Sequence, residues 1–186
     1  MSRTLILLSA AFLVATSAQA QVVVGGNSLA RDCFLKTKTD DHGRKSSIKL
    51  CERALAEEFL KTDDEVATYV NKGILLMRSG NYEASLNSYD AAIELDPQLA
   101  EAHINRGACL IFLNQPEAAV QALSRSIELD TKHLPDALFN RAIAYERLGK
   151  TTAAYKDLKQ ASHLRPDWEL PSQLLENYTV VTKSAD

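Results

Sequence analysis

The sequence predicts an all-α fold in which helical hairpins stack along one axis into a solenoid, closed by a further helix near the C-terminus. Two observations predict this class. First, Asn71, Asn105 and Asn140 recur at spacings of 34 and 35 residues, each two residues before a glycine or an alanine. Second, the apolar residues inside each period return at three- and four-residue steps, as on one face of a helix. A self-similar period of this length indicates a solenoid of supersecondary units.

Each period holds two helices, whose key positions agree across the three copies. The first helix contains a small residue, and the second helix contains another one twelve residues later. Two antiparallel helices joined by a short turn must approach closely, so a larger side chain at their crossing would hold them apart. Each of the following groups gives one position of the period in its first, second and third copy: Gly73, Gly107 and Ala142; Leu76, Leu110 and Tyr145; Ser79, Leu113 and Leu148; Ser85, Ala119 and Ala154; Tyr89, Leu123 and Leu158; and Ala92, Ser126 and Ala161.

The turns and ends of these helices have their own signals. Gly80, Asn114 and Gly149 stand between the two helices of each unit, and each tolerates a left-handed backbone. Pro97 and Pro166 follow second helices, where a proline ends a helix. These residues predict a tight turn within each hairpin and a defined break between hairpins.

The pattern resembles the tetratricopeptide repeat. In that family a small residue is followed by an aromatic residue or a leucine, and further on by an alanine, an aromatic residue and a proline. The resemblance covers three repeats, at residues 66–99, 100–134 and 135–168. It implies a right-handed α-solenoid whose first helices line a concave groove. Two departures are visible. The family's first-helix tryptophan is replaced by Tyr69, His103 and Leu138, and one residue is inserted around "TKHLP". We expect the insertion to lengthen one connection without breaking the stack.

The first twenty residues have the anatomy of a secretory signal peptide: an arginine near the start, a short apolar run and a final Ala-Gln-Ala. The apolar run is too short for a membrane span, which needs about 20 residues. We expect cleavage after Ala20 and a periplasmic or secreted product. The removed segment holds one basic residue and no acidic one, so the net charge changes from −3 to −4. A mildly acidic chain argues against nucleic acid as the partner.

Residues 21–65 are expected to form a leader and a degenerate helical hairpin. "LARDCFLKTK" and "RKSSIKLCERALAEEFL" read as amphipathic helices around the loop "TDDHG". Cys33 then lies on one helix and Cys51 on the other, facing each other, and an oxidising compartment permits a disulfide between them. The alternative is a pair of buried reduced thiols. Residues 167–186 are expected to hold a capping helix, at about 171–178, and a polar tail.

No catalytic or metal-binding motif is visible, so we expect neither an enzyme nor a cofactor. Cys109 is interpreted as a small buried residue, because no base lies nearby in the sequence to activate it. "DDHG", at residues 40–43, is interpreted as a solvated turn and not as a metal site. Glu57 and Glu58 are interpreted as part of a solvated helix face.

The family resemblance implies a peptide-binding groove lined by the first helices. An asparagine amide both donates and accepts hydrogen bonds, as a peptide backbone does. The three asparagines either bind the backbone of a ligand or bridge neighbouring first helices. The carboxylate clamp known in the family is not expected, since it needs lysine where this chain has Val70 and Asp136. Carried over by position, the lining consists of Val70, Asn71, Ile74, Ile104, Asn105, Ala108, Ile111, Phe112, Phe139, Asn140, Ile143, Glu146 and Arg147.

These observations predict a non-enzymatic scaffold or adaptor that binds an extended peptide or a partner's helix in the groove. The first alternative is a self-assembling structural protein, because short repeat arrays can stack through an uncapped end. The second is an unrecognised enzyme, which would need a bound metal or a reactive thiol at Cys109.

Overall fold

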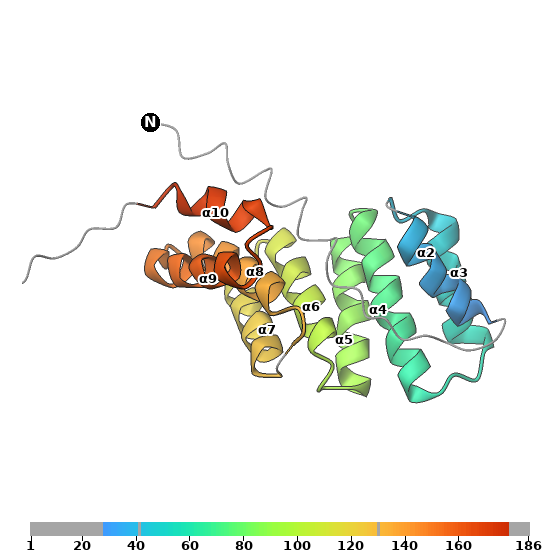
Figure 1. The fold of residues 1–186 in the computed structure, drawn as a ribbon. Helices are drawn as coiled ribbons and strands as arrows, with labels where there is room; N and C mark the ends of the chain where they lie inside the picture. The colour runs from blue at the N-terminus through green and yellow to red at the C-terminus, as the bar shows by residue number, and fades with distance from the viewer. Residues whose placement is uncertain (1–27, 41, 130, 179–186) are drawn as a thin grey trace, which may run out of the picture.

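The helices of the chain pack as successive antiparallel hairpins along one axis. A computed structural model describes residues 28–40, 42–129 and 131–178, and the regular structure of these residues is entirely α-helical. Figure 1 shows the α2–α3 hairpin at one end of the row and α9 and α10 at the other. The predicted all-α solenoid is confirmed. The helices are α2 (Leu29–Thr39), α3 (Lys45–Glu57), α4 (Thr62–Arg78), α5 (Tyr82–Leu95), α6 (Ala100–Phe112), α7 (Pro116–Glu128), α8 (Leu134–Arg147), α9 (Thr151–Leu164) and α10 (Glu169–Leu175).

Three predicted features lie partly or wholly outside the described residues. These are the signal peptide at residues 1–20, the leader that follows it, and the polar tail from residue 179. Within the described part, α4 begins at Thr62, ahead of the predicted start of the repeats at residue 66. Its first turn carries Asp63, Asp64 and Glu65, whose negative charges favour a helix N-terminus. The acidic run therefore extends the helix toward its start.

Each hairpin crosses at the small residues that the sequence identified. A Cβ atom added to Gly73 would lie 2.4 Å from a ring carbon of Tyr89, and one added to Gly107 would lie 2.4 Å from Leu123. The Ser85 hydroxyl also donates to the Gly73 carbonyl across the crossing, at 2.8 Å. Tyr89 and Leu123 are fully buried, so each ring or leucine fills the space that the glycine leaves.

The turns inside the hairpins adopt the predicted backbone. Gly80, Asn114 and Gly149 have φ values of 79°, 56° and 70°, in the left-handed region. The inserted residue lies between the second and third repeats. That connection, 129–133, has five residues, whereas the connection at 96–99 has four. The third hairpin still packs against the second, so the extra residue changes only the length of the loop.

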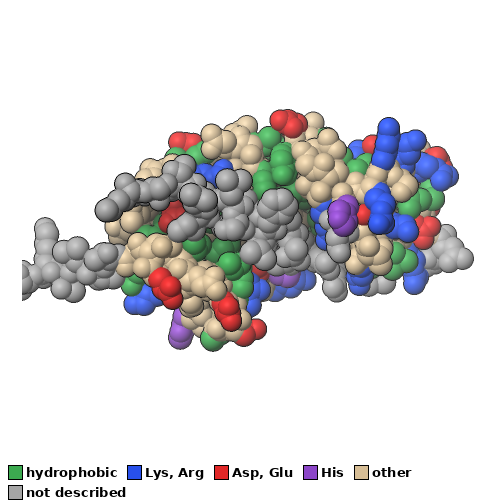
Figure 2. Space-filling view, turned by 90° about the horizontal axis from the view of Figure 1, so that it is seen from above, with side chains coloured by type: hydrophobic (Ala, Val, Ile, Leu, Met, Phe, Trp, Pro, Cys, Tyr) green, Lys and Arg blue, Asp and Glu red, His purple; other side chains and the backbone are tan. Residues whose placement is uncertain are grey.

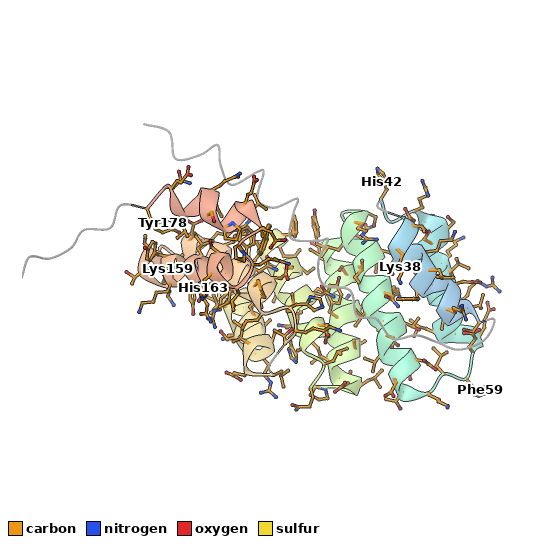
Figure 3. All side chains as sticks on the ribbon, viewed as in Figure 1. Lys38, His42, Phe59, Lys159, His163 and Tyr178 are labelled. Carbon is orange, nitrogen blue, oxygen red and sulfur yellow. A yellow bond between two sulfur atoms is a disulfide. The ribbon has the colours of Figure 1, made fainter. Side chains whose placement is uncertain are left out.

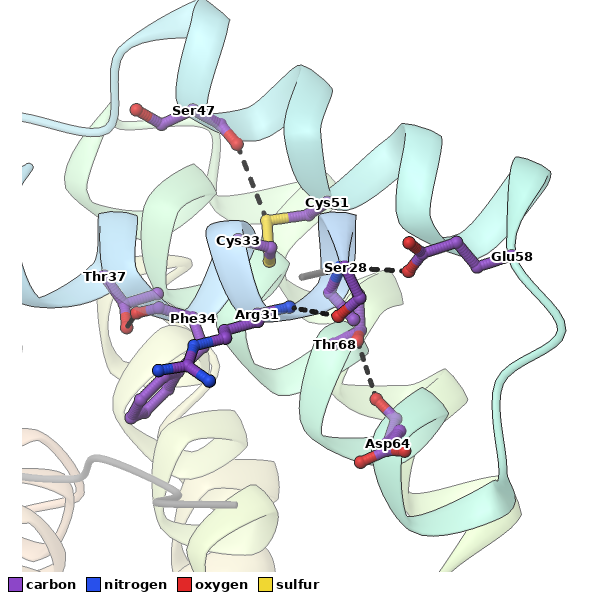
Figure 4. Close-up of a disulfide and its surroundings, with 11 residues drawn as sticks. Ser28, Arg31, Cys33, Phe34, Thr37, Ser47, Cys51, Glu58, Asp64 and Thr68 are labelled. Atoms are coloured by element: carbon purple, nitrogen blue, oxygen red, sulfur yellow. Dashed lines mark hydrogen bonds between the residues drawn. A yellow bond between two sulfur atoms is a disulfide. The ribbon is translucent and has the colours of Figure 1, made fainter. Parts of the chain in front are cut away.

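The N-terminal hairpin, α2–α3, is joined covalently. Cys33 and Cys51 form a disulfide between the two helices, and this is the pair that the sequence led us to expect (Figure 4). The Glu58 carboxylate, at the C-terminal end of α3, accepts from the backbone nitrogens of Leu29 and Ala30 at 2.7 and 3.1 Å. It therefore caps the N-terminus of α2, where free N–H groups favour a negative charge. The interpretation of Glu58 as a solvated residue was wrong.

The turn between α2 and α3 is buried against α4. The Asp40 side chain is 1% exposed and accepts from the backbone nitrogen of Arg44 at 2.7 Å. Burial opposes its ionisation, but hydrogen bonds from Ser47 and from the Arg44 and His42 backbone hold the pKa of Asp40 below its usual value. Gly43 has a φ of 62°, and an added Cβ would lie 1.9 Å from the Leu75 carbonyl oxygen. The prediction of a turn at residues 40–43 is thus correct, but Asp40 and Gly43 in this turn are buried and not solvated.

Arginines on α4 and α8 hold the C-terminal end of the first helix before them. The Arg78 guanidinium, in the last turn of α4, donates to the carbonyl oxygens of Thr37 and Asp40 at the end of α2. Arg147, in the last turn of α8, donates to the Ile111 carbonyl at the end of α6. A cation at this end of a helix satisfies carbonyls that have no partner within the helix. Since α2 is held as α6 is, the N-terminal hairpin packs as a further unit of the solenoid.

Replacing Arg78 by methionine is expected to lower the free energy of unfolding by about 1.5 kcal/mol, because two carbonyls lose a charged donor. Methionine keeps much of the apolar stem, so the loss reports mainly on the hydrogen bonds. The matched control is Arg125→Met, since Arg125 pairs with Glu128 and both side chains are exposed. That change should stay within about 0.5 kcal/mol. Urea titration measures both, and equal losses would show that the carbonyl contacts contribute nothing special.

Candidate functional site

The predicted lining residues lie on the three first helices, α4, α6 and α8. We call the set formed by Val70, Asn71, Ile74, Asn105, Ala108, Ile111, Asn140 and Ile143 the first-helix face. Helical spacing places its members on one side of each helix, because residues three and four apart are neighbours on a helix surface. The apolar members belong to one buried cluster that continues from α4 through α6 to α8. The structure therefore brings these predicted residues together.

The first-helix face is enclosed. All eight of its members are between 0 and 7% exposed. The sequence predicted that these residues line a groove, and their apolar side chains agree with that prediction. However, these side chains do not form a broadly exposed surface. A ligand that reaches this face loses most of its contact with water.

Two asparagines of the face, Asn71 and Asn140, are packed in the interior without a side-chain hydrogen bond to another described residue. Each of them is 2% exposed. The sequence left two roles open, a bond to a ligand and a bridge between first helices. For Asn71 and Asn140 the described structure contains no such bridge. An asparagine amide that makes no hydrogen bond of this kind keeps its donor and its acceptor for a polar ligand.

The C-terminal end of the predicted lining is covered by the chain itself. The Trp168 ring lies 4.6 Å from the Phe139 ring, and the Arg165 guanidinium lies 4.0 Å from the centre of the Trp168 ring. The Tyr178 hydroxyl donates to the Glu146 carboxylate. Tyr178 follows α10, beside α9 (Figure 3). Phe139 and Glu146 therefore contact the C-terminal segment and not a ligand.

Three further predicted residues make internal contacts of their own. The Phe112 ring stacks on Tyr82 at 4.7 Å, in the contact between the first and second repeats. Arg147 donates to the Ile111 carbonyl, as described above, and burial lowers its pKa. Ile104 packs with Ala137 in a separate small cluster between α6 and α8. The predicted lining is thus smaller than the sequence suggested, and the first-helix face is its remaining part.

Charged side chains of α6 and α8 near the face are paired within the chain. Glu101 pairs with Lys132 at 3.2 Å. Asp136, which is 3% exposed, pairs with Arg165 at 2.8 Å. The basic residues that follow the asparagines of α6 and α8 turn toward second helices. These pairs are Arg106 with Asp90, at 2.6 Å, and Arg141 with Asp157, at 2.7 Å, and the bond to Asp157 raises the pKa of Arg141.

Exposed basic residues gather at the α2–α3 end of the molecule. Figure 2 shows lysine and arginine side chains over this hairpin. Lys38 lies over the Phe34 ring, 4.6 Å from its centre. Lysines and arginines of α2 and α3 thus give this end of the molecule a basic surface.

The described residues form no recognisable catalytic or metal centre. None of their His, Cys, Asp and Glu side chains gather in a group of three or more that could hold a metal ion. Cys109 is fully buried, its thiol donates to the Tyr82 carbonyl at 3.0 Å, and burial raises its pKa to about 11. The thiol is therefore protonated at neutral pH, which makes it a poor nucleophile.

His103 gives the fold a dependence on pH. Burial lowers its pKa, and an Nε2 contact with the Pro97 carbonyl, at 3.0 Å, only partly opposes this. The unfolded chain then binds more protons than the folded chain below about pH 6.5. We expect the free energy of unfolding to fall as the pH drops through this range, and to fall less in His103→Gln. Urea titrations at pH 7.5 and 5.5 measure both, and the same decrease in the two proteins would assign it to other groups.

The sequence alone gave no sign of several contacts at this site. The capping helix was expected at about 171–178, whereas α10 spans Glu169–Leu175 and Trp168 precedes it. Trp168 and Tyr178 reach back to the first helix of the third repeat. This contact depends on how the chain turns after α9. Trp168, at the end of the last predicted repeat, was the only signal available.

Comparison with known proteins places the chain in a family. A family model described as "TPR repeat" matches residues 73–110, and one described as "Tetratricopeptide repeat" matches residues 110–167. The human FK506-binding protein-like protein is 30% identical over 123 residues, which are 62% of this chain and 35% of that protein. The DnaJ homolog subfamily C member 7 homolog of Schizosaccharomyces pombe is 33% identical over 98 residues, 50% of this chain and 20% of that protein. The chain thus spans about a third or less of these curated relatives.

Solved structures show the same fold. MamA superposes with a TM-score of 0.66 at 22% identity, covering 77% of this chain and 80% of that chain. YrrB, described as a TPR protein with an unusual peptide-binding site, superposes with a TM-score of 0.67 at 20% identity, covering 80% and 73%. Among the described residues, no helix has both the length and the apolar character that crossing a membrane requires.

Proposed function

We propose that this chain, which belongs to the tetratricopeptide repeat family, is a non-enzymatic protein-interaction module that binds an extended peptide segment at the first-helix face. Proteins of this fold are generally interaction scaffolds, and the fold of this chain is the same. The observation that carries the finer proposal is the state of the asparagines. Asn71 and Asn140 occupy the same place on α4 and α8, are enclosed, and have no hydrogen bond with another described residue.

An asparagine amide suits a peptide backbone because it donates to a carbonyl and accepts from an N–H at once. Two such amides, on first helices that flank α6, would hold a segment running across the three helices. The aliphatic side chains of Ile74 and Ile111 would contact the side chains of that segment. YrrB has the same fold and is described as having a peptide-binding site, which supports this proposal by analogy only.

An exported location is also part of the proposal. The Cys33–Cys51 disulfide suits an oxidising compartment, as a periplasmic or secreted protein would meet. The partner is accordingly sought among proteins of the cell envelope or the medium.

The test is an affinity capture from envelope extract that compares the wild type with Asn71→Ala/Asn140→Ala. Neither asparagine has an internal bond among the described residues, so the double variant should keep its fold. The matched control is Asn87→Ala, since Asn87 lies exposed on the second helix α5. We expect one or more proteins to be captured by the wild type and the control but lost in the double variant. Identical capture by all three proteins would remove the first-helix face from the proposal.

A further inference from the structure

We propose that a surface cleft between α3 and the end of α4 receives Leu95 of a second copy of this chain. The cleft has a volume of about 440 Å³, and none of the residues that line it belongs to the first-helix face. This surface is therefore separate from the one in the proposed function. We call it the α3–α4 cleft, and its lining includes Lys45, Ile48, Lys49, Glu52, Leu76 and Ser79.

The chain departs from its own repeat at this cleft. Ser79 stands where the second and third repeats have Leu113 and Leu148, and the three residues have the same backbone, with φ values of −84°, −76° and −85°. Leu113 packs against the main hydrophobic cluster. The Ser79 hydroxyl instead donates to the Leu76 carbonyl at 2.8 Å. The first repeat thus lacks the side chain that packs at this place in the second.

The floor of the cleft is apolar and its rim is basic. Ile48 and Leu76 belong to one buried cluster and are 8 and 7% exposed. Lys45 and Lys49 stand one turn apart on α3, and neither has an ion pair with another described residue. Glu52 contributes one negative charge, so the rim keeps a net positive charge. An aliphatic side chain with carboxylates beside it has the chemistry that this cleft would bind.

The basic rim is particular to this end of the solenoid. Lys45 stands two residues before the buried small residue of its helix, and Glu83 and Glu117 have that place in α5 and α7. Figure 2 shows further lysine and arginine side chains over the α2–α3 end. A negatively charged surface is therefore attracted to this cleft more than to the equivalent places on the other second helices.

Leu95, at the end of α5, offers the complementary chemistry. Its side chain is 39% exposed, with exposed Glu94 before it and Asp96 after it. Neither acid has an ion pair with another described residue. Inserted into the cleft of a second copy, Leu95 would contact the aliphatic floor while the two carboxylates approach the lysines. The two surfaces differ, so each copy would offer one of each and copies would join in a row.

The first experiment measures the mean mass of the purified chain by light scattering, at concentrations up to about 1 mM. We expect the mass to rise with concentration, and to rise less at about 500 mM than at about 50 mM NaCl, because salt screens the charged rim. Ser79→Leu should remain a monomer, since its side chain takes the place of the incoming leucine. Ser79→Ala leaves the cleft open and should associate as the wild type does.

Exposed leucines supply a second matched pair of variants. Leu164 has the place of Leu95 in the third repeat and is 46% exposed, but its neighbours are His163 and Arg165. We expect Leu95→Ser to abolish the association and Leu164→Ser to leave it unchanged. Both changes are at exposed positions, so circular dichroism should show the wild-type helix content in each.

A charge exchange tests the pairing itself. Lys45→Glu/Lys49→Glu makes the rim acidic, and Glu94→Lys/Asp96→Asn makes the Leu95 surface basic. The asparagine keeps an acceptor for the backbone nitrogen of Gln98, which Asp96 holds at 2.9 Å. Each variant alone has like charges on both surfaces and should stay monomeric. An equimolar mixture has opposite charges again, and we expect it to associate.

The outcomes separate this contact from the proposed function. A monomeric wild type at every concentration would overturn the inference, as would association that persists in Ser79→Leu or in Leu95→Ser. A mixture of the charge variants that stays monomeric would overturn the pairing of Lys45 and Lys49 with the acids. Association in Asn71→Ala/Asn140→Ala that equals the wild type would support the cleft as an independent surface. Loss of association in that variant would assign the contact to the first-helix face.

Discussion

Replacing Cys33 and Cys51 together by alanine is expected to lower the free energy of unfolding by about 3 kcal/mol. The disulfide closes a loop with a sequence separation of 18 residues, and cross-linking a loop of this size restricts the unfolded chain by roughly that amount. The two sulfur atoms lie in the interior of the α2–α3 hairpin (Figure 4), where both cysteines are fully buried. The loss should appear first as hydrogen exchange in α2 and α3, because that hairpin packs at one end of the solenoid.

Thiol titration gives an independent test of the same bond. At pH 8 the native protein should show no reactive thiol, because burial raises the pKa of Cys109 to about 11 and the other two cysteines are bonded. Unfolding without reductant should expose one thiol, and unfolding after reduction should expose three. Three thiols in the unreduced unfolded chain would show that the cysteines are not joined. An unchanged stability of the double variant would show that the bond does not hold the fold.

Replacing Trp168 by alanine is expected to lower the free energy of unfolding by about 2 kcal/mol. The ring is partly buried and packs against Phe139, and the Arg165 guanidinium lies over it. Removing an aromatic side chain from such a contact loses apolar burial and the ring interactions. The loss should also free α10, since Trp168 is the residue on which this helix begins.

The measurement is urea titration followed by circular dichroism, because the Trp168 variants lack the single tryptophan of the chain and give no tryptophan fluorescence. Trp168→Phe should recover part of the stability by keeping an aromatic ring at the contact. Leu164→Ala is the matched control at the same end, since Leu164 is 46% exposed, and it should change stability by less than about 0.5 kcal/mol. A loss in Trp168→Ala no larger than in this control would mean that α10 does not close the array.

The repeats could be predicted from the sequence because each rests on local rules that recur. Gly73 and Gly107 are glycines since a Cβ would meet Tyr89 or Leu123, and Gly80 and Gly149 are glycines since the backbone there is left-handed. Such constraints act within one hairpin and repeat at a fixed period. The period is therefore visible without knowing how the hairpins stack.

Contacts between units could not be predicted in this way. Arg78 and Arg147 cap the first helix of the preceding unit, although the second repeat has Phe112 at that place, which stacks on Tyr82 instead. The arginine and phenylalanine residues at this one repeat position thus serve two purposes, and no spacing rule predicts which contact each of them makes. Glu58 was assigned to solvent for the same reason, because its partners at Leu29 and Ala30 belong to another helix.

The candidate site shows the same division. The asparagines and aliphatic residues of the face were identified by their position in the repeat. Their near-complete burial was not, and neither was the cover that Trp168 and Tyr178 place over Phe139 and Glu146. Those features depend on the path of the chain after the last repeat, which a repeat pattern does not describe.

The measurement that tests the central claim most directly is nuclear magnetic resonance of the asparagine side-chain amides during titration with an extended peptide taken from a captured partner protein. The account predicts that the side-chain amide resonances of Asn71 and Asn140 shift together as the peptide binds, while those of exposed Asn87 stay in place. Shifts confined to other residues, with Asn71 and Asn140 unchanged at saturation, would show that the peptide binds elsewhere and would contradict the account.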